Sequence, residues 1–300
     1  MEKIGFIGLG IMGKPMAQNL MKAGYPLVFY ARKPEVIAEM KNGGAISVSS
    51  PRSVAESADI IITIVTADSQ LREVMLGEKG VLAGASAGKL IVDMSTVSPL
   101  TAREIAEAAA AAGVHFMDAP VSGGDTGAIQ GTLTIIAGGD KEDFLRCRDL
   151  FMVIGKEENI FHVGAVGTGQ TVKMANQFIG AINMAAVAEA LTLGIKAGAD
   201  PEMMHRVISV SSGNSTLFQN RVKDYVLKGD FTPGFFLDLC KKDLGIGVSM
   251  AQALGMPTPI GAAAYQMYVA ASCLGAGKLD FSAVCKAIET MSGVCISDKK

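Results

Sequence analysis

The sequence predicts an α/β unit with a doubly wound, mainly parallel sheet, followed by an all-helical unit. In the first half, short apolar runs rich in β-branched and aromatic residues alternate with amphipathic segments, which is typical of successive βαβ units. From about residue 168 the pattern is helical throughout, without a convincing strand. We therefore expect an α/β domain over 1–164 and an all-helical domain over 165–300.

The composition indicates a globular chain with two ordinary cores. The 300 residues are 49% hydrophobic and 19% charged, with a net charge of −2, so nothing favours nucleic acid or an anionic membrane as a partner. The five cysteines include no C-x-x-C pair, and the three histidines are scattered. We expect no metal site and no disulfide framework, and a cytoplasmic location.

The elements of the first unit follow from these patterns. Ser98 and Pro99 mark a helix start, because Ser is a good N-cap and Pro suits the first helical position. A further helix is expected from about Lys141 to Phe151, and one long helix over 168–197 opens the second unit. The expected strands are KIGFIG, PLVFY, DIIITIV, KLIVDMS, VHFMDAP and TLTIIAGG.

A glycine pattern follows the first expected strand. Gly8, Gly10 and Gly13 have G-x-G-x-x-G spacing, with Ile11 and Met12 inside the turn. The first glycine permits a tight turn, the second lets backbone approach a pyrophosphate, and the third lets helix and strand pack closely. The helix N-terminus would hold the phosphates. The pattern predicts a Rossmann-type dinucleotide site.

The end of the second expected strand bears on which dinucleotide binds. An NAD site usually has Asp or Glu there to bind the ribose hydroxyls. This strand ends at Tyr30 and Ala31, and Arg32 and Lys33 follow; the next carboxylate is Glu35. The two cations favour NADP(H) over NAD(H), the alternative being a solvated basic turn that accepts either cofactor.

Four segments, in order along nearly the whole chain, carry a family resemblance. They are GFIGLGIMGKPMAQNL at 5–20, DAPVSGG at 118–124, GTGQTVKMANQ at 167–177 and KKDL at 241–244. With them the sequence resembles the β-hydroxyacid dehydrogenases, the family of 3-hydroxyisobutyrate dehydrogenase, tartronate semialdehyde reductase and glyoxylate/succinic semialdehyde reductase. The resemblance implies an NAD(P)-dependent oxidoreductase that interconverts a small carboxylated aldehyde and its hydroxy acid.

The resemblance also implies roles for individual residues. Lys173 would be the catalytic acid/base, and Lys242 would close over the nicotinamide end of the cofactor. Val65, Thr66 and Thr96 would line the cofactor, at the carboxyl ends of strands where ligands bind in open α/β sheets. The implied substrate residues are Ser122, Gly123, Gly124, Asn176 and Gln177.

The substrate remains open at this stage. DAPVSGG together with GDTGAIQGTL is most similar to the tartronate semialdehyde (2-hydroxy-3-oxopropionate) reductases. Methylmalonate semialdehyde, the partner of 3-hydroxyisobutyrate, succinate semialdehyde and glyoxylate are the alternatives. An imine reductase and a catalytically silent binding module are disfavoured by Lys173. The resemblance implies that residues 1–164 are the dinucleotide-binding domain and that 165–300 are the substrate and dimerisation domain. A homodimer or homotetramer is expected from the family.

Overall fold

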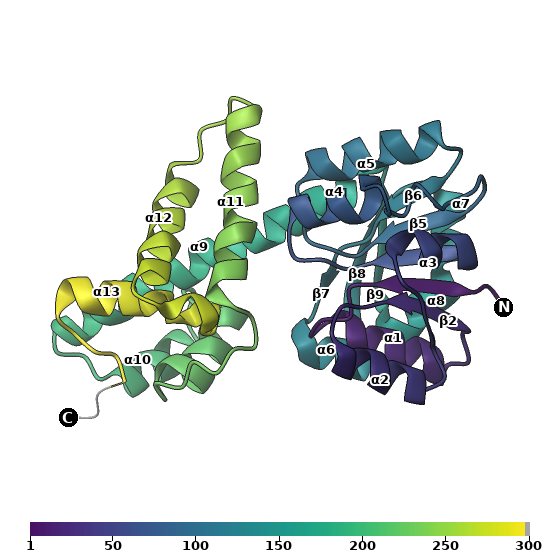
Figure 1. Cartoon of the computed structure of the whole chain (residues 1–300). Helices are drawn as coiled ribbons and strands as arrows, with labels where there is room; N and C mark the ends of the chain where they lie inside the picture. The colour runs from purple at the N-terminus through teal and green to yellow at the C-terminus, as the bar shows by residue number, and fades with distance from the viewer. Residues whose placement is uncertain (298–300) are drawn as a thin grey trace. The chain divides into compact units, whose positions relative to one another are not determined.

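The computed structural model describes residues 1–297, and the chain divides into two compact units, Met1–Lys173 and Met174–Lys300. The first is an α/β unit and the second is helical (Figure 1), which confirms the predicted fold class. The predicted boundary at residue 164 precedes the long helix, whereas this division lies inside it. The first turn of that helix is hydrogen-bonded to the α/β unit, which accounts for the difference.

Within residues 1–297, nine strands form one sheet in the order β3-β2-β1-β4-β5-β6-β8-β7, with β9 beside β8. Strands β1 to β6 pair in parallel, whereas β8 is antiparallel to β6 and β7. The sheet is therefore mainly parallel, as predicted. The strands are β1 (Ile4–Ile7), β2 (Leu27–Tyr30), β3 (Ile46–Ser47), β4 (Ile60–Thr63), β5 (Leu90–Asp93), β6 (His115–Asp118), β7 (Val121–Ser122), β8 (Leu133–Gly138) and β9 (Gly155–Gly164).

The strand register brings the carboxyl ends of five strands into one row. Ile7 is paired with Tyr30 on one side and Thr63 on the other, Thr63 with Asp93, and Asp93 with Asp118. The loops that leave these residues contain most of the predicted cofactor residues. Ligands bind at this edge in open parallel sheets, because the loops and helix N-termini converge there.

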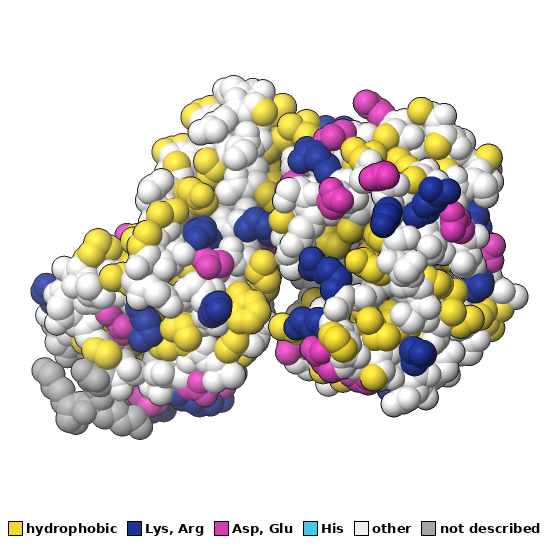
Figure 2. Space-filling view, in the orientation of Figure 1, with side chains coloured by type: hydrophobic (Ala, Val, Ile, Leu, Met, Phe, Trp, Pro, Cys, Tyr) yellow, Lys and Arg dark blue, Asp and Glu magenta, His cyan; other side chains and the backbone are white. Residues whose placement is uncertain are grey.

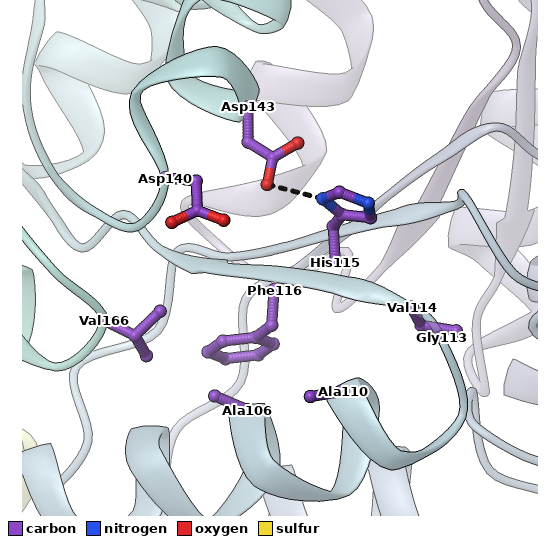
Figure 3. A pocket seen from close by; sticks show the side chains of 9 residues that line it. All are labelled: Ala106, Ala110, Gly113, Val114, His115, Phe116, Asp140, Asp143 and Val166. Carbon is purple, nitrogen blue, oxygen red and sulfur yellow. Dashed lines mark hydrogen bonds and ion pairs between the residues drawn. The ribbon is translucent and has the colours of Figure 1, made fainter.

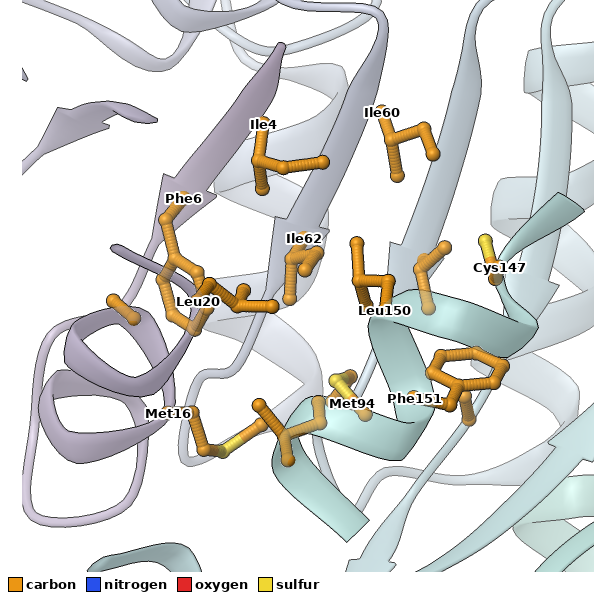
Figure 4. Close-up of a cluster of buried hydrophobic side chains, with 14 of the residues drawn as sticks. Ile4, Phe6, Met16, Leu20, Ile60, Ile62, Met94, Cys147, Leu150 and Phe151 are labelled. Atoms are coloured by element: carbon orange, nitrogen blue, oxygen red, sulfur yellow. The ribbon is translucent and has the colours of Figure 1, made fainter. Parts of the chain in front are cut away.

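Helices cover both faces of the sheet, so the central strands are buried on both sides and form continuous apolar runs. Figure 4 shows Ile4, Phe6, Ile60 and Ile62 on the face covered by α1 and α8. Residues of α3, α4 and α5 form the core on the other face. The helices of this unit are α1 (Gly13–Lys22), α2 (Pro34–Asn42), α3 (Pro51–Ser57), α4 (Asp68–Leu76), α5 (Pro99–Ala111), α6 (Gly124–Gln130), α7 (Lys141–Arg146) and α8 (Arg148–Ile154).

Three strands and one helix break were not predicted. β3 and β7 have two residues each, too short for a periodic signal. β9 is a ten-residue strand whose first residue is followed by the exposed, charged residues Lys156, Glu157 and Glu158, and it has no regular apolar alternation. The helix predicted from Lys141 to Phe151 is two helices, which meet at Cys147.

The second unit is helical in its described part. The long helix α9, whose first residues belong to the α/β unit, begins at the predicted residue and ends one residue before the predicted end. By length and composition α9 would suffice to cross a membrane, but this is weak evidence because core helices of soluble proteins share these properties. All five cysteines of the chain are free. The elements are α9 (Thr168–Lys196), α10 (Pro201–Ile208), a π-helix (Phe218–Val226), α11 (Leu237–Ala253), α12 (Pro259–Cys273), two 3-10 turns (Ala276–Lys278 and Phe281–Val284) and α13 (Cys285–Ser292).

Candidate active site

The glycine turn connects β1 to α1 and has the form that a bound dinucleotide requires. Gly8 has a φ of +101°, and a side chain there would collide with the backbone of Ile64. A side chain at Gly13 would collide with the Gly8 carbonyl. Gly10 is exposed, and a Cβ there would meet nothing. The turn thus presents open backbone at Gly10, followed by the N-terminus of α1, where the cap residue Met12 makes no side-chain hydrogen bond.

The turn between β2 and α2 carries the predicted basic residues. Arg32 and Lys33 are exposed, and Ala31 is half-buried. The first carboxylate, Glu35, lies in the first turn of α2. These residues fit a phosphate on the ribose, because two cations are accessible and the turn itself has no acidic group.

A buried serine connects the loops that follow β4 and β5. Ser95 Oγ accepts a hydrogen bond from Val65 N at 2.8 Å and donates one to Asp93 Oδ1 at 2.6 Å. Thr66 Oγ1 donates to Gln70 Oε1 at 2.9 Å. The structure therefore brings the backbone of Val65 close to Ser95, the neighbour of Thr96.

Asp93 is the centre of this buried group. Its Oδ1 also accepts from Thr63 Oγ1 at 2.7 Å, and its whole side chain is buried. Among the described residues, Asp93 Oδ2 has no hydrogen-bond partner. Burial raises the pKa of Asp93 to about 6, although hydrogen bonds from Ser95 and Thr63 act in the opposite direction.

Asp118, at the end of β6, caps the start of α9. Its Oδ1 accepts from Gly167 N at 2.6 Å, and its Oδ2 accepts from Gln170 N at 2.7 Å. A Cβ on Gly138 or Gly169 would lie 2.8 or 2.7 Å from these carboxylate oxygens, so both positions require glycine. Burial raises the pKa of Asp118 to about 6, against the effect of the two backbone donors.

Lys173 lies on α9, three residues after Gln170. Its side chain is buried, with 5% of the residue exposed. Residues three apart share a helix face. The hydrogen bond from Gln170 N to Asp118 therefore also fixes the position of Lys173 relative to the end of β6. The predicted acid/base is thus a buried amine near the start of a helix that is fixed to the carboxyl edge of the sheet.

The predicted substrate loop follows β7. Ser122 is half-buried and pairs with Thr134 of β8. Gly123 and Gly124 have φ values of +135° and +66° and are exposed. Glycine is needed here for the left-handed backbone, which leaves both peptide groups uncovered by side chains of their own.

The remaining predicted residues lie in the helical unit and form one polar chain. Asn176 Nδ2 donates to Gln177 Oε1 at 3.0 Å, and Gln177 Nε2 donates to Asp243 Oδ2 at 2.8 Å. Lys242 Nζ forms an ion pair with Asp243 Oδ1 at 2.8 Å, outside hydrogen-bonding geometry. Asp243 is buried and connects α9 to α11, so it joins the third and fourth family segments.

Several of these structural residues had no predicted role. Their common signal is a polar residue at the end of, or directly after, an apolar strand, or within a mostly apolar helix. Such a residue is expensive to bury unless it has partners, but the partners are distant in sequence and were not visible there. The residues are Asp93, Ser95, Asp118 and Gln170.

A separate cavity of about 390 Å³ lies in the α/β unit, and Figure 3 shows its lining. His115 Nδ1 lies 2.9 Å from Asp143 Oδ2, and a carboxylate oxygen of Asp140 lies within 4.8 Å of ligand-type atoms of both residues. His115 and Asp140 are exposed, and His115 starts β6 whereas Asp118 ends it. None of the residues that line this cavity is a predicted site residue.

An α/β unit with this glycine turn, followed by a helical unit, indicates the class of nicotinamide-dependent oxidoreductases. Residues 3–164 match the family described as the NAD binding domain of 6-phosphogluconate dehydrogenase. Residues 167–288 match the family described as NAD-binding of NADP-dependent 3-hydroxyisobutyrate dehydrogenase. The chain belongs to the β-hydroxyacid dehydrogenase family and is an NAD(P)-dependent oxidoreductase.

Individual relatives span the whole chain. A 2-(hydroxymethyl)glutarate dehydrogenase of Eubacterium barkeri is 42% identical over 295 residues, which cover 98% of this chain and 97% of the relative. A 2-hydroxy-3-oxopropionate reductase of Escherichia coli (strain K12) is 41% identical, covering 97% and 98%. The solved 3-hydroxyisobutyrate dehydrogenase of Mycobacterium tuberculosis is 32% identical, with a TM-score of 0.86 and coverage of 96% and 99%.

Proposed function

We propose that the protein is an NADPH-dependent 2-hydroxy-3-oxopropionate (tartronate semialdehyde) reductase in which Lys173 is the general acid/base. The observation that carries the proposal is the placement of Lys173. It is a buried amine, 5% exposed, on the helix turn that Asp118 and Gln170 fix to the carboxyl edge of the sheet. Predicted cofactor loops leave the same edge.

Besides binding the cofactor and the substrate, the protein must transfer one proton in this reaction. The nicotinamide cofactor, when bound, supplies or accepts the hydride. The protein must stabilise and protonate the carbonyl oxygen as it becomes a hydroxyl, and an ammonium group within hydrogen-bond reach does both. Lys173 would donate this proton in reduction and take it back in oxidation.

The preference for NADPH rests on the turn after β2. Arg32 and Lys33 are accessible, and no carboxylate stands where an NAD site would have one. An arginine can bind a phosphate with two hydrogen bonds, and a lysine adds a further charge. Glu39 is engaged elsewhere, since it pairs with Lys14 at 2.9 Å.

The choice of substrate rests on the loop after β7 and on a relative. The exposed glycines 123 and 124 and the hydroxyl of Ser122 suit one small carboxylate. In this proposal Asn176, and Gln177 beside it, contact the same substrate. The Escherichia coli relative is a 2-hydroxy-3-oxopropionate reductase.

A second candidate function is the interconversion of 2-(hydroxymethyl)glutarate and 2-formylglutarate. It is favoured by the relative from Eubacterium barkeri, which is 42% identical over nearly its full length. This substrate carries two carboxylates and would need a second anion-binding group. A third candidate is the oxidation of 3-hydroxyisobutyrate, because other relatives are named 3-hydroxyisobutyrate dehydrogenase.

The test is the consumption of NADPH and of NADH by the purified protein. The aldehydes to compare are tartronate semialdehyde, methylmalonate semialdehyde, succinate semialdehyde, glyoxylate and 2-formylglutarate. A cyclic imine is included to test for imine reductase activity. The proposal expects NADPH with tartronate semialdehyde to have the highest kcat/KM. A higher value for another aldehyde reassigns the substrate, and turnover of the imine alone refutes the proposal.

We further propose a cytoplasmic homodimer or homotetramer. Along α9, Ile179 and Leu193 are 68% and 71% exposed, although the helix is strongly apolar. Figure 2 shows further hydrophobic side chains at the surface of both units. Contact between subunits would remove such side chains from water.

A further inference from the structure

Gln170 is a fully buried amide for which the proposed function has no role. It lies in the first turn of α9 and has no exposed surface. Its Oε1 accepts a hydrogen bond from Val97 N at 3.1 Å, and its Nε2 donates one to Ser95 O at 2.7 Å. These two backbone groups flank Thr96, so one side chain holds the loop on both sides of a proposed cofactor residue.

The residue type matters for this contact. A carboxamide carries a donor and an acceptor side by side, whereas an ionised carboxylate only accepts and a thioether does neither well. Replacement of Gln170 by Glu would leave Ser95 O without its donor, and replacement by Met would leave both Ser95 O and Val97 N without their partner. The contact is thus specific for an amide of this length.

The backbone of Gln170 is fixed from a second direction. Its N–H donates to Asp118 Oδ2 at 2.7 Å, at the end of β6. Gln170 is therefore attached to the loop after β5 through its side chain and to the end of β6 through its backbone. Lys173 follows on the same helix face, so these bonds set its distance from Thr96.

Ser95 extends the attachment to the neighbouring loop. Its Oγ accepts from Val65 N and donates to Asp93. The loops after β4 and β5 and the start of α9 thus form one hydrogen-bonded body. A change at Gln170 would be transmitted to the backbone that carries Val65, Thr66 and Thr96.

We propose that Gln170 is a positioning residue that locks the Thr96 loop to the helix carrying Lys173. The amide keeps the cofactor-lining backbone and the proton-transferring amine at one fixed separation. This inference rests on the proposed function, in which Thr96 lines the cofactor site and Lys173 moves the proton.

The test compares Gln170→Met and Gln170→Glu with the wild-type protein. NADPH affinity is measured by fluorescence titration without substrate, and kcat and KM are measured with the best aldehyde. We expect Kd for NADPH to rise about tenfold, because Gln170→Met loses both buried hydrogen bonds and Gln170→Glu loses the one donated to Ser95 O. kcat should fall by about tenfold to a hundredfold, because the reacting groups are misplaced.

A matched control separates positioning from stability. Thr192 is buried on the same helix, and its Oγ1 donates to Ala188 O at 2.8 Å, so Thr192→Val also removes a buried hydrogen bond. We expect that variant to lose thermal stability with Kd and kcat unchanged. If the Gln170 variants behave in the same way, the proposal is overturned. Two substitutions are used so that a folding failure of one leaves the other to decide.

Lys173→Ala distinguishes this proposal from the proposed function. If Lys173→Ala retains full turnover, Lys173 is not the acid/base. A rise in Kd for NADPH of the Gln170 variants would then support only the hydrogen bonds by which Gln170 positions the Thr96 loop. If Lys173→Ala loses turnover and the Gln170 variants do not change Kd or kcat, the function stands and the positioning role is refuted.

Discussion

At the residue scale, two cationic side chains carry the functional account, and their environments differ. Lys173 is buried, whereas Arg32 is exposed at the turn after β2. A buried amine suits proton transfer at a reacting atom. An exposed guanidinium suits a phosphate that arrives from solvent.

Replacement of Arg32 by serine should weaken NADPH binding and leave NADH binding unchanged. The loss of a charge-assisted contact to the 2′-phosphate should raise Kd for NADPH by about tenfold or more. Isothermal titration with both cofactors measures this. Lys41→Ser, in the last turn of α2, is the control for the loss of one positive charge. Equal weakening of NADH binding would contradict the role given to Arg32.

At the element scale, the long helix and the strand order show what the sequence could and could not predict. The long helix and the main parallel strands follow from periodicity, because each pattern lies within one segment. β9 was missed because its exposed, charged residues give no apolar alternation. The cap of α9 by Asp118 was missed because its partners lie 49 and 52 residues away in the chain.

The buried carboxylate of Asp93 should make stability depend on pH. Its pKa is raised by burial to about 6 in the folded protein, against 3.8 ordinarily. The folded state therefore binds the proton more tightly, and this contribution is present below about pH 4 and lost as the pH rises through about 6.

Comparison with Asp93→Asn isolates that contribution, because the asparagine does not titrate and Asp118 titrates in both proteins. From about pH 4 to about pH 7.5, the free energy of unfolding of the wild type should fall relative to the variant. The upper limit of this fall is about 3 kcal/mol, at about 1.4 kcal/mol per pKa unit. Urea unfolding across this range measures it. A constant difference between the two proteins would contradict the raised pKa.

At the scale of the whole molecule, the two units contain different parts of the proposed site. The α/β unit contains the glycine turn, the proposed cofactor loops and the start of α9. The helical unit holds the chain of polar contacts from Asn176 to Lys242. α9 belongs to both, and its exposed apolar residues support association between subunits.

Replacement of Leu193 by aspartate should shift the oligomer toward smaller species. Leu193 is 71% exposed in the single chain, so the substitution costs the fold little but places a charge in a proposed apolar contact. Light scattering after gel filtration measures the mass. Glu189→Gln, on the same helix, is the control. An unchanged mass for Leu193→Asp would remove this residue from the interface.

The central claim is that Lys173 moves the proton, and Lys173→Met tests it most directly, because methionine keeps much of the side-chain length without the amine. The measurement is kcat at saturating NADPH and aldehyde, with Kd for NADPH determined on the same preparation. The account predicts a fall in kcat of about a hundredfold to ten-thousandfold, with Kd for NADPH little changed. Full turnover by the variant would contradict the account.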